Sequence, residues 1–287
     1  MAGSDRSAPG IPDVSLSTMV IVPAGDLAAV EDVLNRDKDI AALILEPTGA
    51  HYGQLPFDAP NYLKGLRDLT AQHGVVLIFD EVVTGFRASP GGAQVRYGIN
   101  PDLTTMAKIV AGALPGGAVG GKAEIIDMIA HRGDPEWDNT HRVYHPGTFN
   151  GNPLTAVAGA TCLEIIASQP INQQADAMGA RLKVGINDIF GKMEMAGHAH
   201  GIASMIHVVM ADCGCDRELC TMPHSQIKEV TASPAVTALK RGLQNLGVDI
   251  MGRDSFLVSA THTEQEVDQT LAAFETTLAA IRDEGLA

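Results

Sequence analysis

The chain has 287 residues, with 20 Lys and Arg against 34 Asp and Glu, and its formal net charge of −14 excludes a nucleic acid or an anionic membrane as a partner held through a basic face. The 45% share of hydrophobic residues is enough to bury a core, which excludes a largely disordered chain. Because the sequence has no secretory signal pattern and no uncharged apolar run of about 18 residues, we expect a cytoplasmic protein with no membrane partner.

Apolar runs and helical periodicity alternate in the first part of the chain. The β-branched run at 18–22 predicts a strand, and the apolar spacing over 26–35 predicts a helix after it. A second buried strand is predicted at 41–45, followed by a helix over 60–73. This alternation is typical of βαβ units, so the sequence predicts an α/β fold with a mostly parallel sheet.

The strongest strand prediction lies at 75–79, where five consecutive apolar residues indicate burial on both faces and a central place in the sheet. Asp80 follows this strand directly. A shorter strand-like run at 102–107 leads to Lys108, and a glycine-rich loop comes next. Open α/β sheets bind their ligands at the carboxyl ends of strands. We therefore expect Asp80 and Lys108 to face one crevice.

The second part of the chain begins after a predicted helix over 152–168. Pro170 cannot continue a helix interior, so we predict a domain boundary there, with a large domain over 1–169 and a smaller α+β domain over 170–287. A capping box of Thr263 and Glu266 predicts the start of the last helix. The other predicted elements are a helix at 171–195, a strand at 203–210, a helix at 234–246 and a strand at 256–260.

Asp80 and Lys108 together supply what pyridoxal phosphate requires. Lys108 offers an amine for a Schiff base, and Asp80 offers a carboxylate that keeps the pyridine nitrogen protonated, so that the ring acts as an electron sink. Taken singly, an Asp at a strand end is commonly a turn or cap residue, and a lone Lys is commonly a solvated charge.

Five ordered motifs strengthen this interpretation. They are Glu46-Pro47, FDEVVTGFR at 79–87, PDLTTMAK at 101–108, LPGGAVGG at 114–121 and GTFNGNP at 147–153. Through them the chain resembles the class III aminotransferases of fold type I, and within that family it is most similar to the glutamate-1-semialdehyde 2,1-aminomutase branch. The resemblance implies a partial PLP-transferase type I large domain, followed by a smaller C-terminal domain.

The resemblance also implies roles for individual residues. Lys108 would be the Schiff-base lysine, Asp80 the partner of the pyridine nitrogen, and Val82 the apolar residue on one ring face. Thr148 would bind the cofactor phosphate from the neighbouring subunit, with Gly147 allowing a close backbone approach. The family therefore implies a homodimer that uses pyridoxal phosphate on a small-molecule substrate, an amino acid or an amine.

The chain departs from the family pattern in two regions that bear on the cofactor. The stretch at 20–26 already matches a family segment well downstream of the phosphate-binding turn, so we expect the N-terminal third to be absent. Because that turn is a main source of phosphate affinity, cofactor binding could be lost with it. Beside the lysine, Ala107, Ala111 and Ala113 stand where family members usually have glycine, which predicts a stiffer loop.

Two alternatives to a PLP enzyme stay open. One is ester hydrolysis without pyridoxal phosphate on the same scaffold, and the other is a non-catalytic remnant. Retention of Asp80, Lys108 and Thr148 favours the PLP enzyme. Hydrolysis would need a nucleophile outside the G-x-S-x-G elbow, because the sequence lacks that motif. The candidate nucleophiles and bases are Ser204, Ser255, Ser259, His207 and His262.

A cysteine-rich segment has the residue types of a metal site. The pattern C-x-C-x4-C-x3-H, with His207 in the preceding predicted strand, combines thiolates and imidazoles, which are zinc ligands. It is formed by Cys213, Cys215, Cys220 and His224. Since the spacing lacks C-x2-C hooks, the sequence favours free thiols in a turn and no metal. His198 and His200 lie in a Gly-flanked stretch, where we expect solvated side chains.

Overall fold

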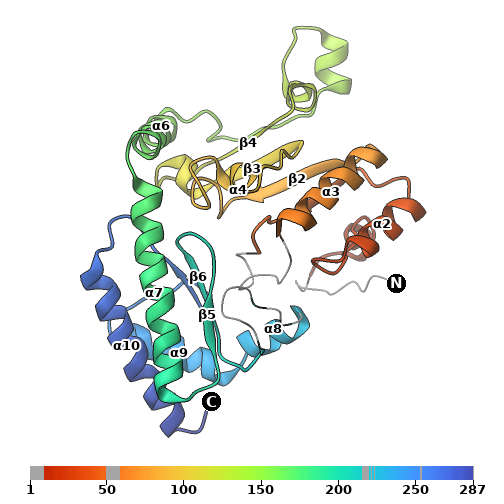
Figure 1. The fold of residues 1–287 in the computed structure, drawn as a ribbon. Coiled ribbons are helices and arrows are strands. Elements are labelled where there is room, and N and C mark those ends of the chain that lie inside the picture. Colours follow the sequence, from red (N-terminus) through yellow and green to blue (C-terminus); the bar gives the residue numbers. More distant parts are fainter. Residues whose placement is uncertain are drawn as a thin grey trace.

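The computed structural model describes residues 10–49, 59–214, 220, 222, 224–252 and 254–286, with the backbone alone for residues 59, 224 and 225. Two sheets organise this part of the chain (Figure 1). One has four strands in the order β1-β2-β3-β4, and the other has three strands in the order β5-β6-β7. The prediction of an α/β fold is confirmed.

The four-stranded sheet is mostly parallel, as predicted. Its strands are β1 (Ala42–Leu45), β2 (Val76–Glu81), β3 (Leu103–Ala107) and β4 (Gly117–Gly121). The first three run parallel, and β4 returns antiparallel to β3. The crossover from β1 to β2 is α3 (Ala59–His73), which packs on α2 (Leu27–Arg36) through Val30, Leu34, Tyr62 and Leu66.

Three details of this region differ from the sequence predictions. No strand forms at 18–22, where Met19, Val20 and Ile21 are 64%, 42% and 54% exposed, because no described strand lies beside them to pair with. The predicted buried strand β1 is an edge strand, with Ile44 58% exposed. Strand β2 is internal as predicted, but its side chains alternate between a buried and a half-buried face.

The three-stranded sheet is antiparallel and consists of β5 (His198–His200), β6 (Met205–Val209) and β7 (Ser255–Leu257). Helices α7 (Ile171–Met193), α9 (Pro234–Asn245) and α10 (Glu264–Asp283) cover it. Their core includes Ile186, Phe190, Leu239, Leu243 and Phe274. The predicted capping box at the start of α10 is confirmed. Strand β5 and helix α8 (His224–Thr231) were not predicted.

Helix α6 (Pro153–Ser168) connects the two sheets. It begins at Asn152, whose side chain accepts hydrogen bonds from the backbone N–H groups of Leu154 and Thr155. It then meets α7 at a bend of 74°, which falls at the predicted boundary between 169 and 170. The division into two domains stays a prediction. Among the described residues no single helix has the length and hydropathy of a membrane span, and only the bent pair α6 and α7 satisfies both together.

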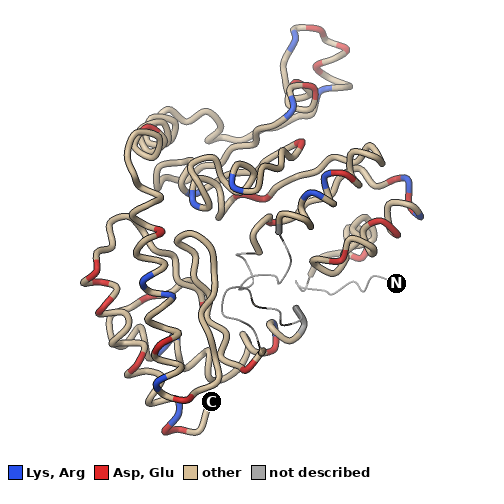
Figure 2. The backbone as a smooth tube through the Cα atoms, viewed as in Figure 1, with Lys and Arg blue, Asp and Glu red and all other residues tan. Residues whose placement is uncertain are grey.

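The shorter elements complete the chain. These are α1 (Asp13–Leu16), α4 (Gly92–Tyr97), the 3-10 helices η2 (Lys108–Ala111) and η3 (Asp127–Ile129), α5 (Ala123–Ile126) and the π-helix η4 (Trp137–His141). The segment with α5 and η4 projects away from the sheets (Figure 1). Acidic and basic residues are interspersed along α2, α3 and α7 (Figure 2).

Candidate active site

The structure places Asp80 and Lys108 at the same edge of the four-stranded sheet. Strands β2 and β3 are parallel neighbours, and Asp80 lies opposite Thr105 in their register. Lys108 is the first residue after β3 and begins η2. Asp80 is itself the fifth residue of β2, whereas the sequence predicted it just beyond the strand. The two residues therefore lie at adjacent carboxyl ends, where parallel sheets bind ligands.

The Asp80 carboxylate is held by one of its two oxygens. Its Oδ1 accepts hydrogen bonds from the backbone N–H of Val82 at 3.1 Å and from the Thr105 hydroxyl at 3.4 Å. Its Oδ2 accepts no hydrogen bond from any residue in the described part of the chain. The side chain is half-buried. A fixed carboxylate with one oxygen available can accept a hydrogen bond from a ligand.

Lys108 combines an open side chain with an unusual backbone. The residue is exposed, and within the described ranges its ammonium group makes no ion pair or hydrogen bond. Its φ angle is +55°, in the left-handed region that costs a residue with a side chain roughly 1–2 kcal/mol. Strained backbone of this kind clusters at functional sites.

Glu81 is a residue of this region to which the sequence analysis gave no role. It is 1% exposed, and its carboxylate accepts hydrogen bonds from the N–H groups of Ala93 at 2.5 Å and Gln94 at 3.2 Å, at the start of α4. At Gly92, where φ is +73°, a Cβ would collide with this carboxylate. Glu81 thereby ties the segment after Asp80 to α4. The signal was the strand alternation, because neighbouring residues of a strand point to opposite faces.

The loop that carries Lys108 packs closely on α6. A Cβ at Gly112 would collide with the backbone of Ala158, and a Cβ at Gly159 would collide with the carbonyl oxygen of Val110. The Thr155 hydroxyl donates a hydrogen bond to the Pro115 carbonyl at 3.2 Å. The loop and the first turns of α6 therefore form one packed unit.

The alanines expected to stiffen this loop differ in backbone conformation. Ala107 has a φ of −151°, which is extended and accessible to any residue. Ala113 has a φ of +69°, in the region that favours glycine. Alanine in place of glycine is therefore strained at Ala113 and unstrained at Ala107.

Gly147 and Thr148 lie apart from this pair in the contacts that the structure shows. They belong to an exposed turn in which the Asn150 N–H donates to the Gly147 carbonyl at 3.0 Å. Thr148 makes no hydrogen bond with another described residue, and the adjacent Phe149 is 78% exposed. The chain by itself does not bring Thr148 to Asp80 or Lys108, so the role implied for it requires a second subunit and stays a prediction.

Among the candidate residues for hydrolysis, one serine hydroxyl lies against one histidine ring nitrogen. His207 Nδ1 and Ser255 Oγ lie 2.8 Å apart, but the two residues are 1% and 7% exposed. Burial, with His200 as the second cause, lowers the pKa of His207 to about 3. The Ser204 hydroxyl faces Arg87 at 3.5 Å, and His262 accepts a hydrogen bond from the Ser259 N–H. The His207 and Ser255 pair is therefore a weak base with an enclosed hydroxyl. Ser259 and His262 are exposed, but the imidazole binds the Ser259 backbone N–H, and the Ser259 hydroxyl lies 3.0 Å from that of Thr261.

The fold and the sequence both match known proteins. The family model described as "Aminotransferase class-III" matches residues 5–278. The chain is 33% identical over 279 residues to a glutamate-1-semialdehyde 2,1-aminomutase of Methanococcoides burtonii, covering 94% of this chain and 60% of that protein. It is 34% identical over 268 residues to glutamate-1-semialdehyde 2,1-aminomutase 2 of Brevibacillus brevis, covering 92% and 59%.

Solved structures agree with these relatives. An omega-transaminase of Sphaerobacter thermophilus superimposes with a TM-score of 0.83 at 30% identity, covering 96% of this chain and 60% of that one. A structure described as a transaminase with PLP bound gives a TM-score of 0.80 at 25% identity, covering 98% and 62%. The chain spans about 60% of the length of the curated relatives it matches. Its architecture is that of the PLP-dependent transaminases of fold type I, and the chain belongs to the class III aminotransferase family.

Proposed function

We propose that this protein is a PLP-dependent aminotransferase or aminomutase-like enzyme that acts on the amino group of an amino acid or amine through Lys108. The observation that carries the proposal is the pair of open groups at adjacent strand ends, the Lys108 ammonium and the Asp80 Oδ2. The family match and the relative with PLP bound support pyridoxal phosphate as the cofactor.

The described residues fit this cofactor in chemical type. When bound, pyridoxal phosphate supplies an aldehyde that forms a Schiff base with an amine and a ring that acts as an electron sink. Lys108 offers the amine, and Asp80 offers an acceptor for a protonated ring nitrogen. Val82 follows the strand end that carries Asp80 and offers an apolar side chain for one ring face. The neighbouring subunit of a homodimer would contribute Thr148 and Gly147 to the phosphate.

The contacts around Asp80 explain how it would perform this role. The Val82 N–H and the Thr105 hydroxyl both engage Oδ1, so the carboxylate cannot rotate freely. The position of Oδ2 is therefore fixed before a ligand binds, and this lowers the conformational entropy lost on binding. A carboxylate beside the ring nitrogen favours the protonated form of that nitrogen.

Lys108 would act as the proton carrier of the reaction. Its amine could take the proton from the carbon next to the substrate amino group and return it at another position. The packing of the loop on α6 keeps the start of η2 in place, so this amine stays near the edge of the sheet. The residues that select a particular substrate are not assigned.

Cofactor labelling tests the proposal directly. The purified chain is titrated with pyridoxal phosphate, reduced with borohydride and digested, and the modified lysine is identified by mass spectrometry. We expect one adduct per chain at Lys108, absent in Lys108→Arg and retained in Lys64→Arg, which alters an exposed lysine of α3. An adduct spread over several surface lysines, or one that persists in Lys108→Arg, would contradict the assignment.

A further inference from the structure

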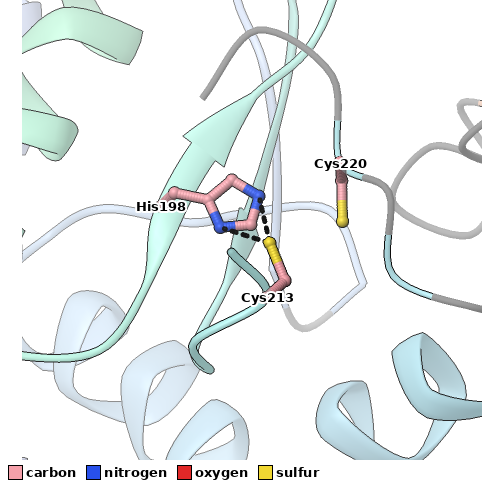
Figure 3. Close-up of side chains that lie close together, drawn as sticks. All are labelled: His198, Cys213 and Cys220. Atoms are coloured by element: carbon pink, nitrogen blue, oxygen red, sulfur yellow. Dashed lines mark hydrogen bonds between the residues drawn. The ribbon is translucent and has the colours of Figure 1, made fainter. Parts of the chain in front are cut away.

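Three side chains of the second sheet region meet at a point that the proposed active site does not use. His198 begins β5, Cys213 follows β6, and Cys220 lies further along the chain before α8 (Figure 3). One ligand atom from each lies within 4.8 Å of the others. Cys213 Sγ is 3.7 Å from His198 Nδ1 and 3.8 Å from Nε2.

The hairpin register explains why His198 and Cys213 meet. His198 pairs with Val209 at the end of β6, so the chain that leaves β6 passes beside the start of β5. Cys213 comes four residues after Val209 and turns back toward the imidazole. The expectation that His198 and His200 are solvated is wrong, because both lie in β5 and are 5% and 0% exposed.

The separations match those of a tetrahedral zinc site. Zinc binds thiolate sulfur at about 2.3 Å and imidazole nitrogen at about 2.0–2.1 Å, so tetrahedral angles place the two ligand atoms about 3.6 Å apart. The 3.7 Å and 3.8 Å distances from Cys213 Sγ to the His198 ring fall close to this value. Because Sγ is almost equidistant from the two ring nitrogens, it lies off both lone-pair axes, so the His198 ring must rotate before one nitrogen and Sγ can share an ion.

An entry path to this point is present. A cavity of about 430 Å³ is lined by both His198 and Cys213, and also by the acidic residues Glu194 and Asp212. A cation can reach the two ligands from solvent, and the two exposed carboxylates at the cavity favour its approach. On the protein side the site is closed by Cys220, which is fully buried.

Cys220 is the fully buried member of the cluster. It packs with Val209, Met222 and Ile227, and its sulfur is hydrogen-bonded to the Met222 backbone. A bound metal deprotonates its thiol ligands, so the Cys220 sulfur would bind the ion as a thiolate.

We propose that His198, Cys213 and Cys220 form a zinc site that fastens the β5–β6 hairpin to the segment leading into α8. Binding releases one proton from each thiol, and a fourth ligand, such as water, completes the coordination. Cys213 is disulfide-bonded in the structure, so its sulfur must first be reduced. A phosphine reductant supplies the two electrons and takes the oxygen of one water to become its oxide, and the two protons of that water go to the two sulfurs.

Metal binding to the reduced chain tests this site without any assay of activity. The protein is treated with a phosphine, dialysed against excess Zn²⁺ and then against metal-free buffer, and zinc per chain is counted. We expect one ion per chain, and a sulfur-to-cobalt charge-transfer band when Co²⁺ replaces zinc. The melting temperature should rise with zinc, because the ion binds only the folded chain.

Matched variants make the test specific. His198→Asn and Cys213→Ser should each lose the ion and the rise in melting temperature, whereas Cys162→Ser, which alters a free cysteine of α6, should keep both. His198 is buried, so its replacement could disturb the fold. Cys213 is only half-buried, so loss of the ion in Cys213→Ser as well would show that a missing ligand, rather than misfolding around His198, is the cause. Less than one ion per reduced chain, or one ion retained in both His198→Asn and Cys213→Ser, would overturn the proposal.

Discussion

The two ends of β3 each carry a charged side chain, and the two side chains differ in burial and in the number of their partners. At the amino end, Asp102 is 3% exposed and pairs with Arg67 at 2.9 Å and Lys122 at 2.8 Å, and it also accepts the Leu77 N–H at 2.7 Å. At the carboxyl end, Lys108 is exposed, strained and without a partner in the described ranges. The five residues of β3 thus lie between Asp102, whose charge is paired, and Lys108, whose charge has no partner in the described ranges.

The difference indicates which end stabilises the fold and which end is kept for chemistry. Asp102 joins α3, β2 and the residue after β4 through one carboxylate. Lys108 contributes no comparable contact, and its backbone conformation costs stability. A residue that costs stability and satisfies no neighbour is expected where function requires it. The contrast can be tested by stability measurements at each end.

Asp102→Asn should have the largest effect on stability. Burial raises the pKa of Asp102, but the hydrogen bonds from Lys122, Leu77 N–H and Arg67 outweigh it, so the pKa is lowered. We expect a loss of about 3 kcal/mol in the free energy of unfolding at pH 7, measured by urea denaturation. Since the folded pKa is below the unfolded one, this contribution is present above about pH 4 and is lost as the pH falls further.

The matched control is Asp68→Asn on α3. Asp68 pairs with Lys64, but both side chains are roughly two-thirds exposed, at 64% and 65%. Such a pair contributes less than about 0.5 kcal/mol. If the two variants lost equal stability, the amino end of β3 would not be the anchor that its contacts suggest.

His207 extends the comparison to the second sheet, where a titratable group is buried in its neutral form. Its pKa of about 3 lies below the ordinary value of 6.5, so between these values the unfolded chain binds a proton that the folded chain does not. Stability from this residue is complete above about pH 6.5 and decreases as the pH falls. At pH 5 the loss should be about 2 kcal/mol relative to pH 8.

His207→Asn isolates this effect. The variant removes the titration, so its free energy of unfolding should change less between pH 8 and pH 5 than that of the parent chain. His73→Asn, at the end of α3, serves as the histidine control and should keep the parent's pH dependence. Parallel pH profiles for His207→Asn and the parent would show that the histidine is not held neutral.

The smallest expected effect is a gain at the open end of β3. Lys108→Gly and Ala113→Gly each remove a side chain from a left-handed residue, with φ angles of +55° and +69°. Each should raise the free energy of unfolding by up to about 1 kcal/mol, after the entropy cost of glycine in the unfolded chain. Only Lys108→Gly should also abolish the cofactor adduct. A loss of stability in Ala113→Gly would mean that the loop is not strained.

Much of the fold could be predicted because the periodic segments are long. Helices α3, α6, α7, α9 and α10 and the central strand follow from apolar spacing and capping residues. The strand expected at 18–22 failed because β propensity needs a neighbour, which local sequence does not reveal. Strand β4 was missed because it is nearly all glycine and alanine around Val119, a composition that reads as a loop.

Some site residues could likewise be placed from the sequence, and others could not. Asp80 and Lys108 could be placed because each ends a predicted strand, and parallel topology then brings strand ends together. The meeting of His198 with Cys213 could not be predicted, because it depends on a hairpin whose first strand has three residues. Glu81 was missed because its partners lie on α4, which begins at glycine without a capping side chain.

The contact of Gly112 and Gly159 bears on how this protein could be engineered. These two positions leave no room for a methyl group, because each faces the backbone of the other segment. A mutant library that varies α6 near Ala158 would therefore displace the lysine before it reshaped any surface for a new substrate. The exposed turn around Phe149 is no better place for such diversity, because the proposed function assigns its residues Gly147 and Thr148 to the cofactor phosphate.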